Sequence, residues 1–245
     1  MKLTPEQLVE NWQQLLEIIE LSFKGERKEK LLKLYNDLQN RIMYMPASYK
    51  EYYHGCFPGG YVIHVLNVIK FAASIDNLWT DSGQTRNYTD EELIFVALNH
   101  DLGKAGDIQH EYYTESNEAW KKNRGELYSI NDDLRHMNIS HRSLWLLNNY
   151  GISFTQTEMV AILLHDGLYD EANDQYLITY YENKRLRDNL PIIIHQADMM
   201  AMSIERDKFY EEKGDRPKTK TVKKKSDEIK VSKGAKDLWD EFTKK

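Results

Sequence analysis

The chain has 245 residues, of which 41% are hydrophobic, and it carries a formal net charge of −6 with one cysteine, a composition typical of a soluble protein with one good-sized core. No stretch approaches the ~18 apolar residues of a membrane-spanning helix. The N-terminus also lacks the pattern of a signal peptide, so we expect a cytoplasmic protein that does not bind a membrane. A single cysteine excludes an intramolecular disulfide framework, and we expect Cys56 to be a small buried hydrophobe.

The charge is unevenly spread along the chain. Residues 208–245 carry a net charge of +5, so the other 207 residues carry about −11. Such an acidic body argues against binding to duplex nucleic acid, because the phosphates of the duplex would repel it. A local basic pocket for a phosphate group is compatible with this charge.

Helical signals follow one another along the chain, and no strand pattern of any length separates them. The first helix begins after Thr4, a capping hydroxyl that is followed by Pro5 and, three residues on, by Gln7. Apolar residues at helical spacing predict further helices at about 26–44, 60–75, 89–101, 139–150, 156–165 and 190–212. The segments between them, above all 105–138 and 167–186, are polar, irregular and rich in tyrosine. The sequence therefore predicts an all-α fold.

The pattern divides the chain into four parts. Residues 1–45 are expected to form N-terminal helices that pack on the core, and residues 46–213 to form the main domain. Residues 214–236 are basic with few apolar side chains, and they predict a disordered linker. Residues 237–245 form a short amphipathic motif, which could bind a protein partner or fold back on the body.

Several predicted helices each present one imidazole or carboxylate at an end or on an apolar face. Each of these residues alone is typical of a structural position, but an aspartate in the apolar helix around Asp198 is costly unless it is paired or bound to a metal. Imidazole and carboxylate ligands suit Mn, Fe, Co, Ni or Zn, and the interior of a helical bundle can assemble them. The residues concerned are His64, His100, Asp101, His141, His165 and Asp198.

The order His, His-Asp, His, His, Asp resembles that of the HD superfamily of metal-dependent phosphohydrolases. The hallmark of that superfamily appears as His100-Asp101-Leu-Gly-Lys104, and the resemblance spans about residues 50–205. His54-Gly-Cys-Phe-Pro-Gly-Gly-Tyr-Val-Ile-His64 is similar to the first-histidine motif in HD domains of bacterial 3′→5′ exoribonucleases, and His195-Gln-Ala-Asp198 resembles the end of those domains. The oligonucleotide-binding domain of those enzymes has no counterpart here. The resemblance implies that residues 46–213 form an HD-domain helical bundle.

The resemblance also implies the metal ligands. The first His, the His-Asp pair and the last Asp would form a one-metal site, while His141 and His165 would add a second metal that Asp101 bridges. We therefore expect one or two divalent transition metals (Mn, Fe, Ni, Co or Zn), and Mg²⁺ is also compatible. Many two-metal members have His-His where this chain has His165-Asp166, which leaves Asp166 as a supporting residue.

The chemistry that follows is hydrolysis of a phosphoester in a nucleotide or oligonucleotide by a metal-activated water. We expect Asp101 and Lys104 to be catalytic, because Lys104 lies about one helical turn after Asp101 and could donate to a phosphoryl oxygen. Lys104, Arg142 and His195 are the expected substrate-binding residues. Their alternatives are a surface lysine, a structural ion pair and a core hydrogen bond, respectively.

Two other functions fit the same residues. A few HD-fold proteins similar to myo-inositol oxygenase use these six ligands to hold two irons, so a di-iron oxygenase acting on a small organic substrate stays open. A non-catalytic HD binding module, in which the C-terminal tail is the working part, also stays open.

Overall fold

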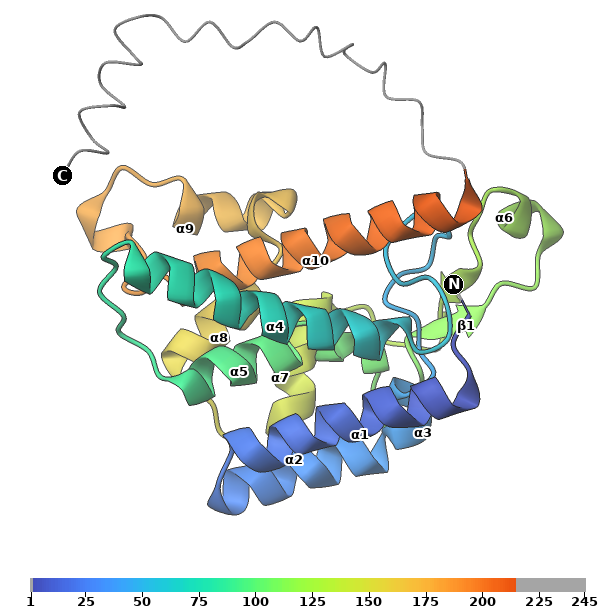
Figure 1. Cartoon of the computed structure of the whole chain (residues 1–245), viewed down its shortest axis with the longest axis horizontal. Coiled ribbons are helices and arrows are strands. Elements are labelled where there is room, and N and C mark those ends of the chain that lie inside the picture. Colours follow the sequence, from blue (N-terminus) through green and yellow to red (C-terminus); the bar gives the residue numbers. More distant parts are fainter. Residues whose placement is uncertain (1, 215–245) are drawn as a thin grey trace, which may run out of the picture.

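The computed structural model describes residues 2–214, and the helices in this part begin where the sequence places capping signals. α1 (Pro5–Ser22), α5 (Asp90–Asn99) and α8 (Gln156–Leu163) each follow a threonine that forms a capping box with the Gln or Glu three residues on. The box satisfies two backbone amides that the helix itself leaves unbonded. The prediction of an all-α fold is confirmed (Figure 1).

The remaining long helices also lie close to their predicted positions. They are α2 (Gly25–Asp37), α4 (Gly60–Asp81), α7 (Ile139–Asn149) and α10 (Leu190–Lys213). The predicted helix 26–44 is divided, because Leu38 leaves helical geometry (φ −100°, ψ 10°) before the short α3 (Gln39–Ile42). A turn of 3₁₀ helix, η1 (Leu102–Ala105), follows the His-Asp pair.

The two irregular segments contain more structure than their sequence suggests. In the first, β1 (Tyr113–Glu115) pairs antiparallel with β2 (Tyr128–Ile130) around the short α6 (Ala119–Asn123). The expectation that no strand is present was therefore wrong for this segment, because strands of three residues are too short to show alternation. The second segment contains only short turns of helix: η2 (Gly167–Tyr169), η3 (Glu171–Asn173), α9 (Asp174–Leu177) and η4 (Glu182–Lys184).

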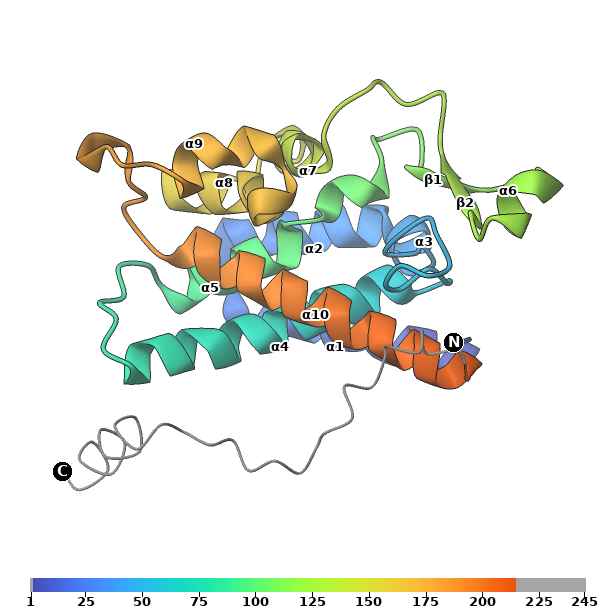
Figure 2. The ribbon, with the colours of Figure 1, turned by 90° about the horizontal axis from the view of Figure 1, so that it is seen from above.

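The core lies between two layers of helices. α10 packs along α4, α5 contacts both α4 and α8, and α7 packs against η1 (Figures 1 and 2). α1 and α2 lie side by side and cover the opposite side of α4 and α5, where Leu15, Ile19 and Leu31 are fully buried. α4, α5, α8 and α10 contact one another and therefore surround one region of the core.

A buried ion pair joins three of these helices. Arg27 of α2 contacts Glu158 of α8 at 2.6 Å and Glu91 of α5 at 2.9 Å, and its guanidinium lies 3.8 Å from the ring centre of Phe95. The Glu158 side chain is fully buried. The pair therefore anchors the N-terminal helices to the domain at a point where an unpaired carboxylate would be costly.

Cys56 is buried and free, as predicted. No helix within residues 2–214 combines the length and the apolar character that crossing a bilayer requires. The predicted linker 214–236, except Gly214, and the predicted motif 237–245 lie outside the described residues.

Candidate metal centre

Five of the six predicted ligands meet in the core. His64 comes from near the start of α4, His100 and Asp101 from the end of α5, His165 from just after α8 and Asp198 from α10. All five are buried, with at most 5% of any residue exposed. The imidazole rings of His64 and His100 are 5.5 Å apart between centres, and those of His100 and His165 are 5.0 Å apart.

Asp101 lies at the middle of the group. Its carboxylate oxygens are 3.8 Å from His64 Nε2, 3.6 Å from His100 Nε2 and 3.6 Å from His165 Nε2. Asp198 Oδ1 lies 3.1 Å from His64 Nε2. Three ring nitrogens and two carboxylates therefore converge on one small volume.

The other nitrogen of each imidazole has an acceptor of its own. His64 Nδ1 lies 3.2 Å from Glu205 Oε2, while the Nδ1 atoms of His100 and His165 lie 2.8 Å from the carbonyl oxygens of Ala97 and Ile162. An acceptor at Nδ1 holds the proton there, so Nε2 of each neutral ring presents a lone pair to the centre. This is the tautomer that a metal ligand requires.

Two of these Nε2 atoms lack a hydrogen-bond partner in the core. His64 Nε2 and His100 Nε2 are buried, and neither forms a hydrogen bond of good geometry within the described residues, even though Asp198 lies close to the first. A buried polar atom without a partner costs about 1–3 kcal/mol, and a cation at the centre would remove this cost. Three groups within the described residues could hold a metal ion: His64 with His100 and Asp101, His165 with Asp166 and Asp198, and His54 with His64 and Glu205.

The charges of the site depend strongly on one another. Burial alone would lower the pKa of His64, but the carboxylates of Glu205 and Asp198 raise it to about 10. Burial likewise opposes the charge on His165, yet the hydrogen bond to Asp101 raises its pKa to about 9. The pKa of His100 falls to about 4, chiefly because of burial. Metal ligands must be deprotonated, so cation binding and proton release are linked at this site.

Lys104 belongs to the centre rather than to the surface. It is buried in η1, and its Nζ lies 2.5 Å from Asp101 Oδ2. Burial alone would lower the pKa of Lys104, but the Asp101 carboxylate raises it above its usual range. A buried ammonium group next to the central carboxylate could donate to an anionic ligand.

The structure does not bring His141 to the centre. Its side chain is exposed, as is that of Trp145 one turn later, whereas Ser140, Arg142 and Ser143 take the buried positions of α7. The helical period places His141 and Trp145 on one solvent-facing side, because residues four apart lie above one another. His141 belongs to none of the candidate metal groups of the described residues, and its role as a ligand stays a prediction. Asp166, which belongs to one of these groups, has Oδ1 3.7 Å from His165 Nε2.

His195 contacts the backbone of the ligand candidate His165. Its Nδ1 lies 2.9 Å from the carbonyl oxygen of His165, so the core hydrogen bond left open by the sequence is present. The ring lies under the turn at Gly167, where a Cβ would be 2.3 Å from His195 Cε1 and φ is +57°. Only glycine fits that turn, and His195 acts on the centre through the backbone of His165.

The sequence reasoning missed two residues of the site. Glu205 bonds His64 and is itself held by Asn67, whose Nδ2 donates to Glu205 Oε1 at 2.7 Å. It lies seven residues after Asp198, which is two helical turns on the same face, so a search for polar residues on the Asp198 face would have found it. The His54 ring lies against that of His64, with ring centres 4.6 Å apart and planes tilted by 43°, and its position in the Gly-Gly motif was a usable signal.

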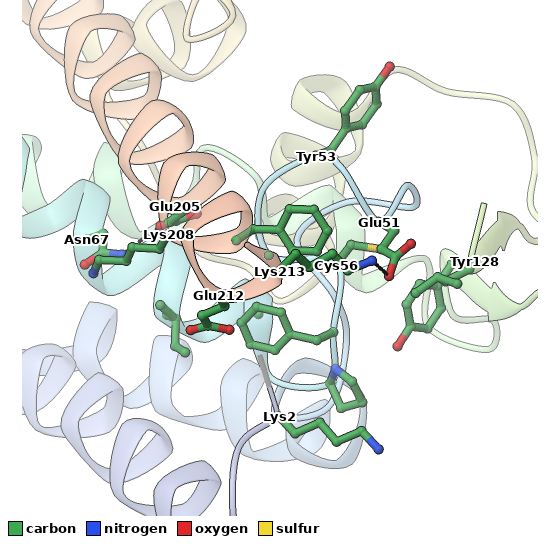
Figure 3. Close-up of a pocket in the computed structure, with 17 residues that line it drawn as sticks. Lys2, Glu51, Tyr53, Cys56, Asn67, Tyr128, Glu205, Lys208, Glu212 and Lys213 are labelled. Carbon is green, nitrogen blue, oxygen red and sulfur yellow. Dashed lines mark hydrogen bonds and ion pairs between the residues drawn. The ribbon is translucent and has the colours of Figure 1, made fainter. Parts of the chain in front are cut away.

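Two pockets lie on different sides of these residues. One of about 430 Å³ is lined by Glu205 and the end of α10, together with the 51–60 loop (Figure 3), and none of the five central residues lines it. The other, of about 580 Å³, is lined by Tyr112, Arg142, Asp166, Asp170 and residues 130–132 and 134–140. Each pocket therefore includes one member of a candidate metal group, Glu205 in the first and Asp166 in the second.

Comparisons of the chain with protein-family models, with curated proteins and with solved structures give no match.

Proposed function

We propose that this chain is a metal-dependent phosphohydrolase of the HD type, which cleaves a phosphoester in a nucleotide or oligonucleotide. One observation carries the proposal: three buried imidazoles, each with Nδ1 already bonded, direct Nε2 toward Asp101 and Asp198. Structural histidines satisfy both nitrogens within the protein, whereas ligand histidines leave one for the cation.

The donor set favours a transition metal. Imidazole nitrogens with carboxylate oxygens suit Mn, Fe, Co, Ni or Zn better than a cation that takes oxygen alone. Two of the candidate groups, the one with Asp101 and the one with Asp166, share no residue, which supports two metals. Asp166 would then take the place that His141 leaves.

Asp101, Lys104 and Arg142 would have separate roles around a bound phosphate. When bound, divalent cations supply a water of lowered pKa and neutralise phosphate charge. Asp101 would hold both metals and orient Lys104, whose ammonium lies beside it. Lys104 would donate to a phosphoryl oxygen as charge develops there. Arg142 would bind the substrate in the pocket that Asp166 lines.

A screen for hydrolysis tests the proposal. Protein purified without chelators would be incubated with Mn²⁺, Fe²⁺, Co²⁺, Ni²⁺, Zn²⁺ or Mg²⁺ and a panel of nucleotides, dinucleotides and short oligonucleotides. We expect phosphate or nucleotide release that is lost in His100→Ala/Asp101→Ala and retained in the control His110→Ala, a residue that pairs with Asp107 outside the centre.

Failure of the whole panel would reject the phosphohydrolase. Oxygen uptake with a small organic substrate after anaerobic iron loading would favour the di-iron oxygenase instead. Absence of both activities in metal-loaded protein would favour the non-catalytic binding module.

A further inference from the structure

The pocket beside the metal centre contains a buried cation that forms no ion pair within residues 2–214. Arg142 is 3% exposed. The Asp107 carboxylate favours its charge, and Asp132, Asp166 and Asp170 line the same pocket, but none of these carboxylates pairs with the guanidinium. Its Nη2 donates to the carbonyl oxygens of Arg135 at 2.9 Å and Met137 at 3.3 Å, while its Nη1 is buried with no hydrogen-bond partner. Removing a guanidinium from water without an anion to pair with it is costly, so the pocket calls for an anionic ligand.

The N-terminus of α7, which has no side-chain cap, lines the same pocket. Asn138 is the N-cap residue, but its side chain makes no capping hydrogen bond, unlike the threonines that precede α1, α5 and α8. Residues 137–140 line the pocket, and the first amide hydrogen bond of the helix is the one that Arg142 donates to Asn138 at 2.9 Å. Unbonded amides at a helix N-terminus attract anions. This observation is independent of the Arg142 side chain and indicates the same ligand.

Tyr112 lines the same pocket. The Arg142 guanidinium lies 5.2 Å from the centre of the Tyr112 ring. Burial raises the pKa of Tyr112, while the charges of both Arg142 and Lys104 oppose this shift. Lys104 pairs with Asp101 in the centre, whereas Arg142 has no such partner. The two cations can therefore serve two different anionic groups.

We propose that Arg142 and the first turn of α7 form an oxyanion subsite for a second phosphate group of the substrate, beside the phosphate that is cleaved. The substrate class is then a nucleotide with two phosphate groups, such as a 5′-phosphorylated dinucleotide. The geometry of Arg142 and α7 supports the subsite itself. Its assignment to the substrate rests on the proposed phosphohydrolase function.

Binding of inorganic phosphate to the chelator-treated full-length protein tests the subsite without any catalysis. Titration calorimetry at constant ionic strength should show binding that weakens at least 10-fold in Arg142→Met. The matched control is Arg135→Met, which removes the same charge from an exposed residue of the same pocket and should change the affinity less than 3-fold. Equal losses in the two variants, or no binding by the wild type, would overturn the subsite.

A second measurement covers the case in which Arg142→Met does not fold. Amide resonances of the wild-type protein would be followed by NMR during the phosphate titration. The largest shifts are expected at residues 139–141, and shifts confined to exposed lysines elsewhere would reject the subsite.

Hydrolysis of a dinucleotide with and without a 5′-phosphate then tests the assignment to the substrate. Wild type and Arg135→Met should prefer the phosphorylated form at least 10-fold in kcat/KM, and Arg142→Met should lose this preference mainly through KM. Hydrolysis without any preference would reject the second-phosphate assignment and leave the phosphohydrolase standing. Phosphate binding at Arg142 in a protein that hydrolyses nothing would keep the oxyanion subsite and reject the proposed function.

Discussion

Gly103 lies two residues after the His-Asp pair and packs against α7. The substitution Gly103→Ala should therefore disturb the packing of α7 and the position of His100 and Asp101. A Cβ at this position would lie 2.1 Å from the carbonyl oxygen of Ile139 and 3.0 Å from Arg142 Cβ. Because the first contact is with backbone, α7 or η1 must move, which costs about 1–3 kcal/mol for overpacking of this kind. The movement would also break the 2.8 Å hydrogen bond from Gly103 N to Ser143 Oγ, which adds about 1–2 kcal/mol. We expect a total loss of about 2–5 kcal/mol in the free energy of unfolding.

Urea unfolding followed by circular dichroism measures this loss, and Gly25→Ala is the control. Gly25 has a φ of +56°, and no atom lies within 4 Å of the place that an alanine methyl group would take. Alanine there therefore reports backbone strain alone, about 1–2 kcal/mol. Gly103→Ala should also bind less metal, since it displaces His100 and Asp101. If Gly103→Ala were no less stable than Gly25→Ala, the close approach of η1 to α7 would be refuted.

Four further predictions follow from the same contacts. Arg27→Met should cost about 3–5 kcal/mol, because it leaves Glu158 buried and unpaired; urea unfolding with a loss under ~1 kcal/mol would contradict the buried pair. Burial raises the pKa of the Cys56 thiol to about 12, so its alkylation rate in folded protein should still rise with pH above ~9, where an ordinary thiol levels off. Metal at about 100 times its Kd should add ~2.7 kcal/mol to the stability of the wild type, and a thermal shift of equal size in Asp198→Ala would argue against the ligand assignment. His141→Ala should keep its metal, since the side chain is exposed, and loss of metal would restore the ligand set expected from sequence.

Local signals account for the parts of the fold that could be predicted. The capping boxes at Thr4, Thr89 and Thr155 involve residues only three apart, so they can be read without knowledge of the tertiary structure. The pairing of β1 with β2 joins residues that are distant in sequence, and the division at Leu38 is a change at one residue. Short elements of this kind carry too few residues for a periodic pattern.

The residues of the site also differ in whether the sequence alone could reveal them. His64, His100, Asp101, His165 and Asp198 stand out because a polar residue on an apolar helix face is visible in the sequence. For His141 the sequence does not reveal which side of a short amphipathic helix faces inward, and the choice is made by the packing of α7 on η1. Glu205 lies on the Asp198 face of α10, but it is followed by charged residues at positions 206–208, so it stands out less than a carboxylate on an apolar face.

Metal content measured on the purified chain tests the central assignment most directly. Elemental analysis of protein prepared without chelators should find about one to two equivalents of a transition metal in the wild type and in His110→Ala. It should find almost none in His100→Ala/Asp101→Ala, which removes an unpartnered Nε2 and the central carboxylate. Equal metal content in all three proteins, or wild-type protein that takes up no transition metal when it is supplied, would contradict the metal centre.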